Sequence, residues 1–171
     1  MRTAMYLFRF VWILACLASL ISVSGASASA GTPVSGSQTV LFTGTGYRLW
    51  SSDGWTHTKY YSGAGTFAFS GDGVSLSGTV SRRDITKADA DGNGSVEGVV
   101  TYVNANDGVT CQGPSNGKLT NWALAASVLA HCSDGSTLHG SLQDTGVVFD
   151  DQGNVIGLTT DFSGTLHIPG R

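Results

Sequence analysis

The sequence is poor in charge, and its acids are nearly all aspartate. Lys, Arg, Asp and Glu make up 12% of the 171 residues, with 12 acidic against 9 basic residues, and Glu97 is the single glutamate. This acidic balance offers no basic patch, so neither a nucleic-acid partner nor binding to anionic membranes is expected. Five of the eleven aspartates stand directly beside Gly or Asn, as residues of turns do.

Long hydrophobic runs are missing after the first thirty residues. Within them, Arg2 and Arg9 precede an apolar run over 10–23, and the small residues Ala28 and Ala30 follow it. A charged segment, an apolar segment and an A-x-A site are typical of a secretory signal peptide. The run is shorter than the roughly 20 residues of a membrane-spanning helix, so no membrane span is expected.

Cleavage after Ala30 would divide the chain into a signal peptide, 1–30, and one secreted domain, 31–171, that is extracellular or periplasmic. Loss of the two arginines would change the formal net charge from −3 to −5. A weak lipobox-like sequence ends at Cys16 and is an alternative. The apolar run continues past this cysteine, which favours ordinary cleavage instead.

Cysteine is scarce as well. Three are present, and only Cys111 and Cys132 remain after the predicted cleavage. In an oxidising compartment a lone pair of cysteines predicts one disulfide, with a buried free pair as the alternative.

Recognisable catalytic spacing is missing too. No Gly-x-Ser-x-Gly motif occurs, no mature cysteine is left over as a nucleophile, and the histidines show no zinc-binding spacing. These absences favour a protein that is not an enzyme. A small extracellular hydrolase that uses His57 or His139 with an aspartate stays open as an alternative, because β folds assemble catalytic groups from distant strands. The four histidines are His57, His131, His139 and His167.

The chain does contain short runs rich in β-branched and aromatic residues, separated by Gly, Asp and Asn. Alternation at period two is clear in several of them, which is typical of strands with one buried face. The sequence therefore predicts an all-β fold, a small antiparallel sandwich or barrel rich in hairpins. The clearest runs are 39–42, 66–69, 74–80, 99–103 and 165–168.

A weak internal repeat supports these hairpins. The segments GDGVSLSG (71–78), NDGVTCQG (106–113) and SDGSTLHG (133–140) share Asp-Gly, then Ser or Thr, an apolar or cysteine residue, and a final Gly. Asp-Gly between alternating runs is a strong hairpin signal, because type I′ turns need positive φ at both central residues. The uneven spacing of the repeats argues against a solenoid or propeller.

The segment LTNWALAASVLAH, 119–131, supports two interpretations. Leu119, Trp122, Ala126 and Leu129 share one helical face, whereas the same segment also alternates as a strand. Its alanine content favours a short helix at 120–128, while alignment of the repeats favours a strand near its end.

The segment KADADGNGSVEG, 87–98, carries an oxygen-bearing side chain at every other position. These candidate metal ligands are Asp89, Asp91, Asn93, Ser95 and Glu97. Calcium prefers six to eight hard oxygen ligands, and Gly94 occupies the sixth position, where a calcium loop turns sharply. The pattern predicts one weak calcium site.

This loop resembles the first nine positions of an EF-hand loop, but Val100 stands where the twelfth-position glutamate belongs. It is more similar to the calcium loop of integrin-type β-propeller repeats, whose pattern ends at position nine, as here at Glu97. The resemblance covers about nine residues and implies a loop type only. A plain Asp-Gly turn is the rival interpretation, and Asn93-Gly94-Ser95 also forms an N-glycosylation sequon.

An aromatic group lies between positions 47 and 61, and its candidate ligand-binding residues are Trp50, Trp55, His57 and Tyr60. Flat rings with polar tips suit stacking on a carbohydrate or lining a small-ligand cavity, although packing in the core is the favoured role, because half of the side chains on an alternating strand face inward. A ligand-holding barrel of the kind that avidins and lipocalins form is a further alternative. The leading prediction is a secreted, non-enzymatic all-β domain that binds a partner or serves at a cell surface.

Overall fold

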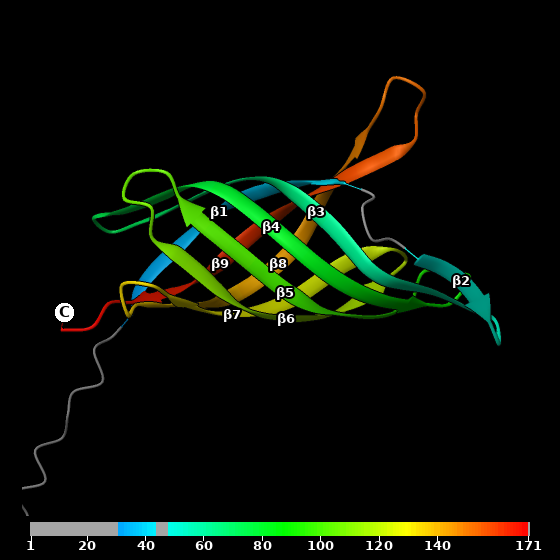
Figure 1. Cartoon of the computed structure of the whole chain (residues 1–171), viewed down its shortest axis with the longest axis horizontal. Helices are drawn as coiled ribbons and strands as arrows, with labels where there is room; N and C mark the ends of the chain where they lie inside the picture. The colour runs from blue at the N-terminus through cyan, green and yellow to red at the C-terminus, as the bar shows by residue number, and fades with distance from the viewer. Residues whose placement is uncertain (1–30, 44–47, 171) are drawn as a thin grey trace, which may run out of the picture.

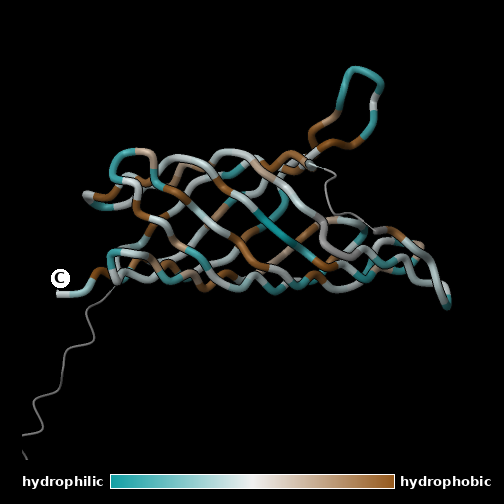
Figure 2. The backbone as a smooth tube through the Cα atoms, in the orientation of Figure 1, coloured by the Kyte–Doolittle hydropathy of each residue, from teal (hydrophilic) through white to brown (hydrophobic). Residues whose placement is uncertain are grey.

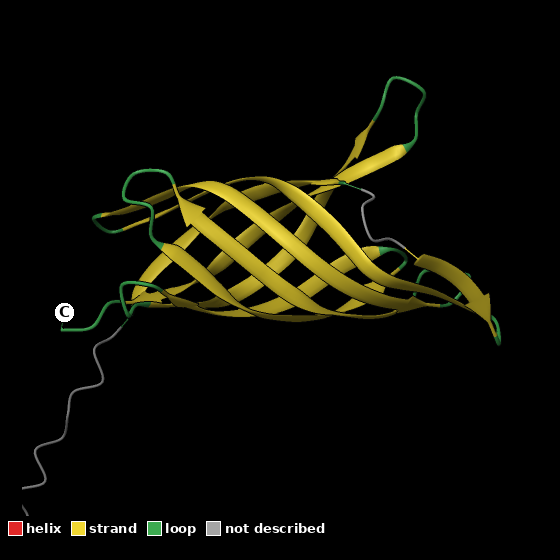
Figure 3. Ribbon diagram, in the orientation of Figure 1, coloured by secondary structure: helices red, strands yellow, loops and turns green. Residues whose placement is uncertain are grey.

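The computed structural model describes the backbone of residues 31–43 and 48–170, and the side chains of these residues apart from 48 and 59–61. The predicted signal peptide lies outside the described residues. Every regular element within them is a strand (Figure 3). The strands are β1 (Thr32–Phe42), β2 (Arg48–Ser52), β3 (Trp55–Gly71), β4 (Val74–Ala88), β5 (Gly94–Asn104), β6 (Thr110–Thr120), β7 (Ala123–Cys132), β8 (Thr137–Phe149) and β9 (Val155–His167).

The strands close into an antiparallel barrel. Neighbours in sequence pair from β3 through β9, β9 then pairs with β1, and β1 pairs with β3 to complete the ring. The short β2 pairs only with the first part of β3 and extends beyond the barrel at one end (Figure 1). The prediction of an all-β, hairpin-rich fold is confirmed, and of its two forms the barrel is the one that the chain adopts.

The two ends of the barrel differ in the turns that they carry. We call the end that carries the β3–β4, β5–β6 and β7–β8 turns the Asp-Gly end, because each copy of the sequence repeat contributes one of these turns. The opposite end, which we call the hairpin end, carries the β4–β5 and β6–β7 turns and two hairpins, β2–β3 and β8–β9, that extend beyond the barrel (Figure 1). The repeat is therefore a structural unit of one end.

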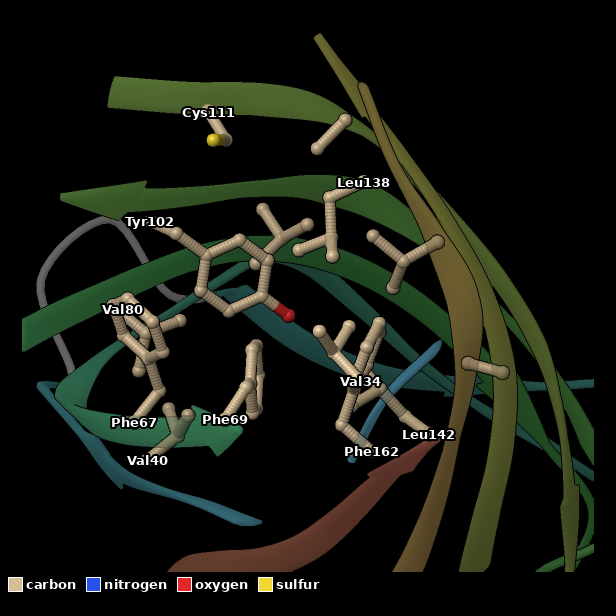
Figure 4. Packing of buried hydrophobic residues seen from close by; sticks show 14 of the residues in the cluster. Val34, Val40, Phe67, Phe69, Val80, Tyr102, Cys111, Leu138, Leu142 and Phe162 are labelled. Atoms are coloured by element: carbon tan, nitrogen blue, oxygen red, sulfur yellow. The ribbon is translucent and has the colours of Figure 1, made fainter. Parts of the chain in front are cut away.

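Alternation along the strands fills the barrel interior. In β7, for example, every second residue from Leu124 to Cys132 is buried and those between are exposed. Hydropathy accordingly alternates along the tube (Figure 2). Aromatic rings occupy the middle: Phe69 stacks on Phe162 with ring centroids 4.4 Å apart, and Tyr102 meets Phe67 edge-on at 5.0 Å (Figure 4). Burial of each such ring stabilises the fold by about 1.5–3 kcal/mol.

The short helix predicted at 120–128 is wrong. Thr120 ends β6, and Asn121 and Trp122 form a two-residue turn with φ of 49° and 67°, after which β7 begins at Ala123. Two consecutive positive φ values match a type I′ hairpin, whose twist suits the flanking strands. Pairing with β6 and β8 satisfies the backbone of β7 on both sides, which outweighs the helix propensity of its alanines.

The predicted disulfide is confirmed. Cys111 of β6 lies directly opposite Cys132 of β7, and the two sulfurs are bonded inside the barrel. Both residues are buried, so the bond is part of the interior at the Asp-Gly end.

The final glycine of each repeat allows neighbouring strands to approach closely. A Cβ atom added at Gly113 would lie 1.8 Å from the carbonyl oxygen of Leu129, and one at Gly78 would lie 2.0 Å from that of Val103. Inward-facing glycines of this kind let a sheet coil tightly enough to close into a barrel. Within the described residues, no helix has the length and apolar character needed to cross a membrane.

Candidate ligand-binding hollow

A hollow of about 320 Å³ opens at the Asp-Gly end. Its floor is formed by inward-facing apolar side chains of the barrel strands, and its rim mainly by polar residues at the β5–β6 and β7–β8 turns. Ligand sites in proteins have volumes of about 300–1,000 Å³ and occur at the mouths of barrels. The floor includes Phe67, Leu76, Tyr102, Cys111, Leu138 and Leu166, and the rim includes Asn104, Asn106, Asp107, Asp134 and Ser136.

The sequence repeat builds this hollow. Its apolar or cysteine position supplies Leu76, Cys111 and Leu138, which face inward near the starts of β4, β6 and β8 respectively. The preceding Asp-Gly reverses the chain beside each of them. One local pattern therefore places an inward side chain and a polar turn together three times around the same opening.

The rim aspartates hold their turns through hydrogen bonds. Asp107 Oδ1 accepts from Asn104 Nδ2 at 2.8 Å and from the Val109 backbone N at 2.9 Å. Asp134 Oδ1 accepts from Ser136 Oγ at 2.7 Å and from its backbone N at 2.9 Å. The hydroxyl bond, followed by the amide bond, lowers the pKa of Asp134, so this carboxylate is ionised at neutral pH.

Below the aromatic floor the interior becomes polar. Arg82 donates to both carboxylate oxygens of Asp84, at 3.0 and 3.2 Å, and to Ser115 Oγ at 3.0 Å. Tyr102 donates its hydroxyl to Gln38 Oε1 at 3.0 Å, across the barrel from β5 to β1. Burial raises the pKa of Asp84, and the Arg82 guanidinium opposes this shift only in part.

Asp144 belongs to the same polar layer on the opposite wall. Its Oδ2 accepts from the Leu124 backbone N at 2.7 Å. The pairing of β8 with β9 shifts register just after it, between Asp144 and Gly146, where the hairpin leaves the barrel. Burial raises the pKa of Asp144. Its Oδ1, the Thr160 hydroxyl and Gln38 Nε2 make no hydrogen bond with the described residues, although they belong to three adjacent strands.

The proposed calcium ligands divide between a turn and a strand face. Asp89 Oδ1 accepts from the backbone N of Asp91 and of Asn93, at 3.0 and 2.8 Å, so it closes the β4–β5 turn. Asn93 Oδ1 accepts from the Asn121 backbone N in the next turn at 3.1 Å. Ser95 and Glu97 are exposed on β5. The structure thus brings Asp89 and Asn93 together, and calcium binding stays a prediction.

The β8–β9 turn repeats the geometry of the β4–β5 turn. Asp150 Oδ1 accepts from the backbone N of Gln152 and of Asn154, and Asn154 Nδ2 donates to Asp150 Oδ2. Both turns read Asp-x-x-Gly-Asn, at 89–93 and 150–154. Because the second has no alternating acids after it, this hydrogen-bonded turn needs no metal to explain its shape. Within 31–43 and 48–170, no three His, Cys, Asp or Glu residues form a metal-binding group.

The predicted aromatic site lies outside the barrel on the β2–β3 hairpin. Trp50 stacks on His57 with ring centroids 5.1 Å apart, and the Lys87 ammonium lies 4.7 Å from the ring centre of Trp55. The side chain of Tyr60 lies outside the description. Trp122, at the β6–β7 turn, is 56% exposed. These tryptophans therefore do not line the hollow. Ligand binding by the aromatic residues of the β2–β3 hairpin stays a prediction, and it concerns a surface separate from the hollow.

Three of the four described histidines make hydrogen bonds with hydroxyl groups. His57 contacts Ser52 Oγ, His131 contacts Thr137 Oγ1, and His167 contacts Thr165 Oγ1. His139 is exposed on β8. Among the described residues, no hydrogen bond or ion pair joins a histidine to a carboxylate, which is the pairing that the hydrolase alternative requires.

Sequence reasoning missed the hollow and the polar layer. A signal for the layer was present, because Arg82 and Asp84 are in phase with the buried Val80 in the alternation of β4. A signal for the hollow was present in the repeat, whose apolar position recurs once per turn. What was missing was the knowledge that the three repeats meet at one end.

Compared with protein-family models, curated proteins and solved structures, the chain matches none of them.

Proposed function

We propose that this protein is a small-ligand-binding barrel, which holds the apolar body of its ligand in the hollow at the Asp-Gly end. The observation that carries the proposal is the hollow itself, with its apolar floor of barrel side chains and its polar rim. A floor mounted on paired strands is rigid, so it is preformed for a ligand. The disulfide between Cys111 and Cys132 braces two strands beside it and fits an oxidising compartment.

The rim residues favour ligand binding over catalysis. Asp107 and Asp134 each direct one carboxylate oxygen to their own turn, and no described histidine lines the hollow. A second, more open depression of about 410 Å³ lies over β3–β6, but mainly outward-facing side chains such as Ser81, Arg83 and Thr101 line it. The hollow is the better enclosed site for an apolar ligand.

The first test measures binding of a neutral apolar fluorophore, N-phenyl-1-naphthylamine. We expect a saturable rise of emission with one site per chain. Leu76→Trp, which fills the hollow, should weaken binding at least ten-fold, because the added ring takes the place of the ligand. Thr79→Trp adds the same ring to the outer face of the same strand and should leave binding unchanged.

Unsaturable emission, or equal affinity in Leu76→Trp, contradicts the proposal. Val74→Trp, on another part of the wall, provides a second blocking variant if the first does not fold. Melting curves of each variant establish that the barrel is intact before binding is measured.

A further inference from the structure

We infer that the ligand of the hollow carries a positively charged head beside its apolar body. This inference rests on the proposed function and adds the chemical class of the ligand, a small cationic amphiphile such as an alkyl ammonium compound. It is carried by the distribution of charge around the opening.

The described turns of the Asp-Gly end carry negative charge that no lysine or arginine of the same turns offsets. Each copy of the repeat brings one aspartate there, Asp72, Asp107 and Asp134, and the last two line the hollow. Within 31–43 and 48–170, no lysine or arginine stands in a turn of this end. The described lysines and arginines instead belong to strands. Their backbone positions are 48 in β2, 59 in β3, 82, 83 and 87 in β4, and 118 in β6.

The carboxylates are oriented as well as near. Hydrogen bonds from each turn occupy Oδ1 of Asp107 and of Asp134. For the described residues, no hydrogen bond is made by either Oδ2, so each carboxylate keeps one oxygen for a guest. The Ser136 bonds that lower the pKa of Asp134 keep this group charged at neutral pH.

An apolar floor beneath two fixed carboxylates discriminates between ligand heads. A cation above the floor is attracted by both charges, an anion is repelled by both, and a neutral alcohol meets neither effect. Cleavage after Ala30 would add one ammonium at Gly31, which lies beside His167 at this end. The three aspartates of the turns still exceed that single charge.

The test uses three ligands that share an octyl chain: octyltrimethylammonium, octanol and octanoate. Each is titrated against bound N-phenyl-1-naphthylamine at low salt and at high salt. We expect the cation to bind at least ten-fold more tightly than the anion, with the alcohol between them. High salt should reduce this preference, because ions screen exposed charges.

The deciding variant is Asp107→Asn/Asp134→Asn, which keeps an amide oxygen for each turn and removes both charges. The preference for the cation should fall to less than two-fold, while octanol binds as in the parent protein. The control Asp150→Asn/Asp151→Asn removes two negative charges from the hairpin end and should leave the preference for the cation unchanged.

The outcomes separate the two proposals. Binding of the fluorophore and of all three ligands with equal affinity overturns the cationic head and leaves the hollow as a binding site. A preference that survives in Asp107→Asn/Asp134→Asn also overturns it. Failure of the fluorophore and of every octyl ligand overturns the proposed function itself.

Discussion

At the scale of single residues, the interior is unusual in its charges. Arg82 and Asp84 are each 5% exposed and satisfy one another, so removal of either partner would leave a buried charge at a cost of about 3–5 kcal/mol. Asp144 has no such partner within hydrogen-bonding distance among the described residues, and burial raises its pKa. Its ionisation therefore opposes folding.

Asp144→Asn tests this point. Between the ordinary pKa near 3.9 and the raised native value, the folded state binds more protons than the unfolded state, so the free energy of unfolding falls as pH rises through that window. The variant does not lose stability with rising pH in this way, and its amide oxygen still accepts the Leu124 N–H. We expect it to be more stable than the parent at pH 7 by no more than about 1 kcal/mol, since the carboxyl is only half-buried, and to lose that advantage near pH 4.

Thermal melting from pH 4 to pH 7 measures the effect. Asp161→Asn, exposed on β9, is the matched control and should show no pH-dependent difference from the parent. An advantage of Asp144→Asn that is equal at both pH values would contradict the raised pKa.

At the scale of elements, the β4–β5 and β8–β9 hairpins are closed by the same Asp-x-x-Gly-Asn turn. In the β4–β5 turn, Asp89 accepts two backbone N–H groups, whereas Asp91 is exposed and its carboxylate accepts no hydrogen bond from the described residues. A calcium site would give both carboxylates similar importance, but a hydrogen-bonded turn depends on the first alone. The two interpretations of the loop therefore differ in a measurable way.

Asp89→Ala should lower the free energy of unfolding by about 1–2 kcal/mol without calcium, since two N–H groups lose their acceptor. Asp91→Ala should change it by less than about 0.5 kcal/mol. Urea denaturation with a chelator present measures both. If the loop binds calcium, millimolar calcium raises the melting temperature of the parent and of neither variant. Equal destabilisation of the two variants without calcium would contradict the turn interpretation.

At the scale of the whole molecule, barrel closure depends on close approach between strands. The pairing of β1 with β3 joins the two ends of the ring, so that no open edge remains in the barrel wall. Inward glycines make this coiling possible, and Gly113 is the tightest example in the repeat, 1.8 Å from a backbone oxygen if a Cβ is added. Backbone atoms cannot move aside as a flexible side chain can.

Gly113→Ala should therefore destabilise the barrel by about 1–3 kcal/mol or more, as overpacking does. Gly146→Ala is the matched control, because an added Cβ there has its nearest neighbour 4.0 Å away. Chemical denaturation of the two variants measures the difference. Similar midpoints for both would contradict the role of Gly113 in closure.

Much of the fold could be predicted from local pattern. Alternation in segments such as 74–80 and 99–103 predicts strands, because burial of one face repeats every second residue. Cys111 and Cys132, the two cysteines outside the predicted signal peptide, predict their own pairing. The segment 119–131 could not be decided locally, since its residues fit both a helix face and a strand face and its alanines favour the helix, whereas pairing with β6 and β8 favours the strand.

The sequence by itself determined most of the strands, the Asp-Gly turns and the cysteine pair, because each depends on backbone preferences or chemistry within a few residues. Tertiary structure alone decided that the three repeats share one end, that their inward residues floor a hollow, and that Arg82 and Asp84 lie inside a closed wall. These properties depend on the register and order of strands far apart in the chain. Barrel closure sets that order, and no local segment contains it.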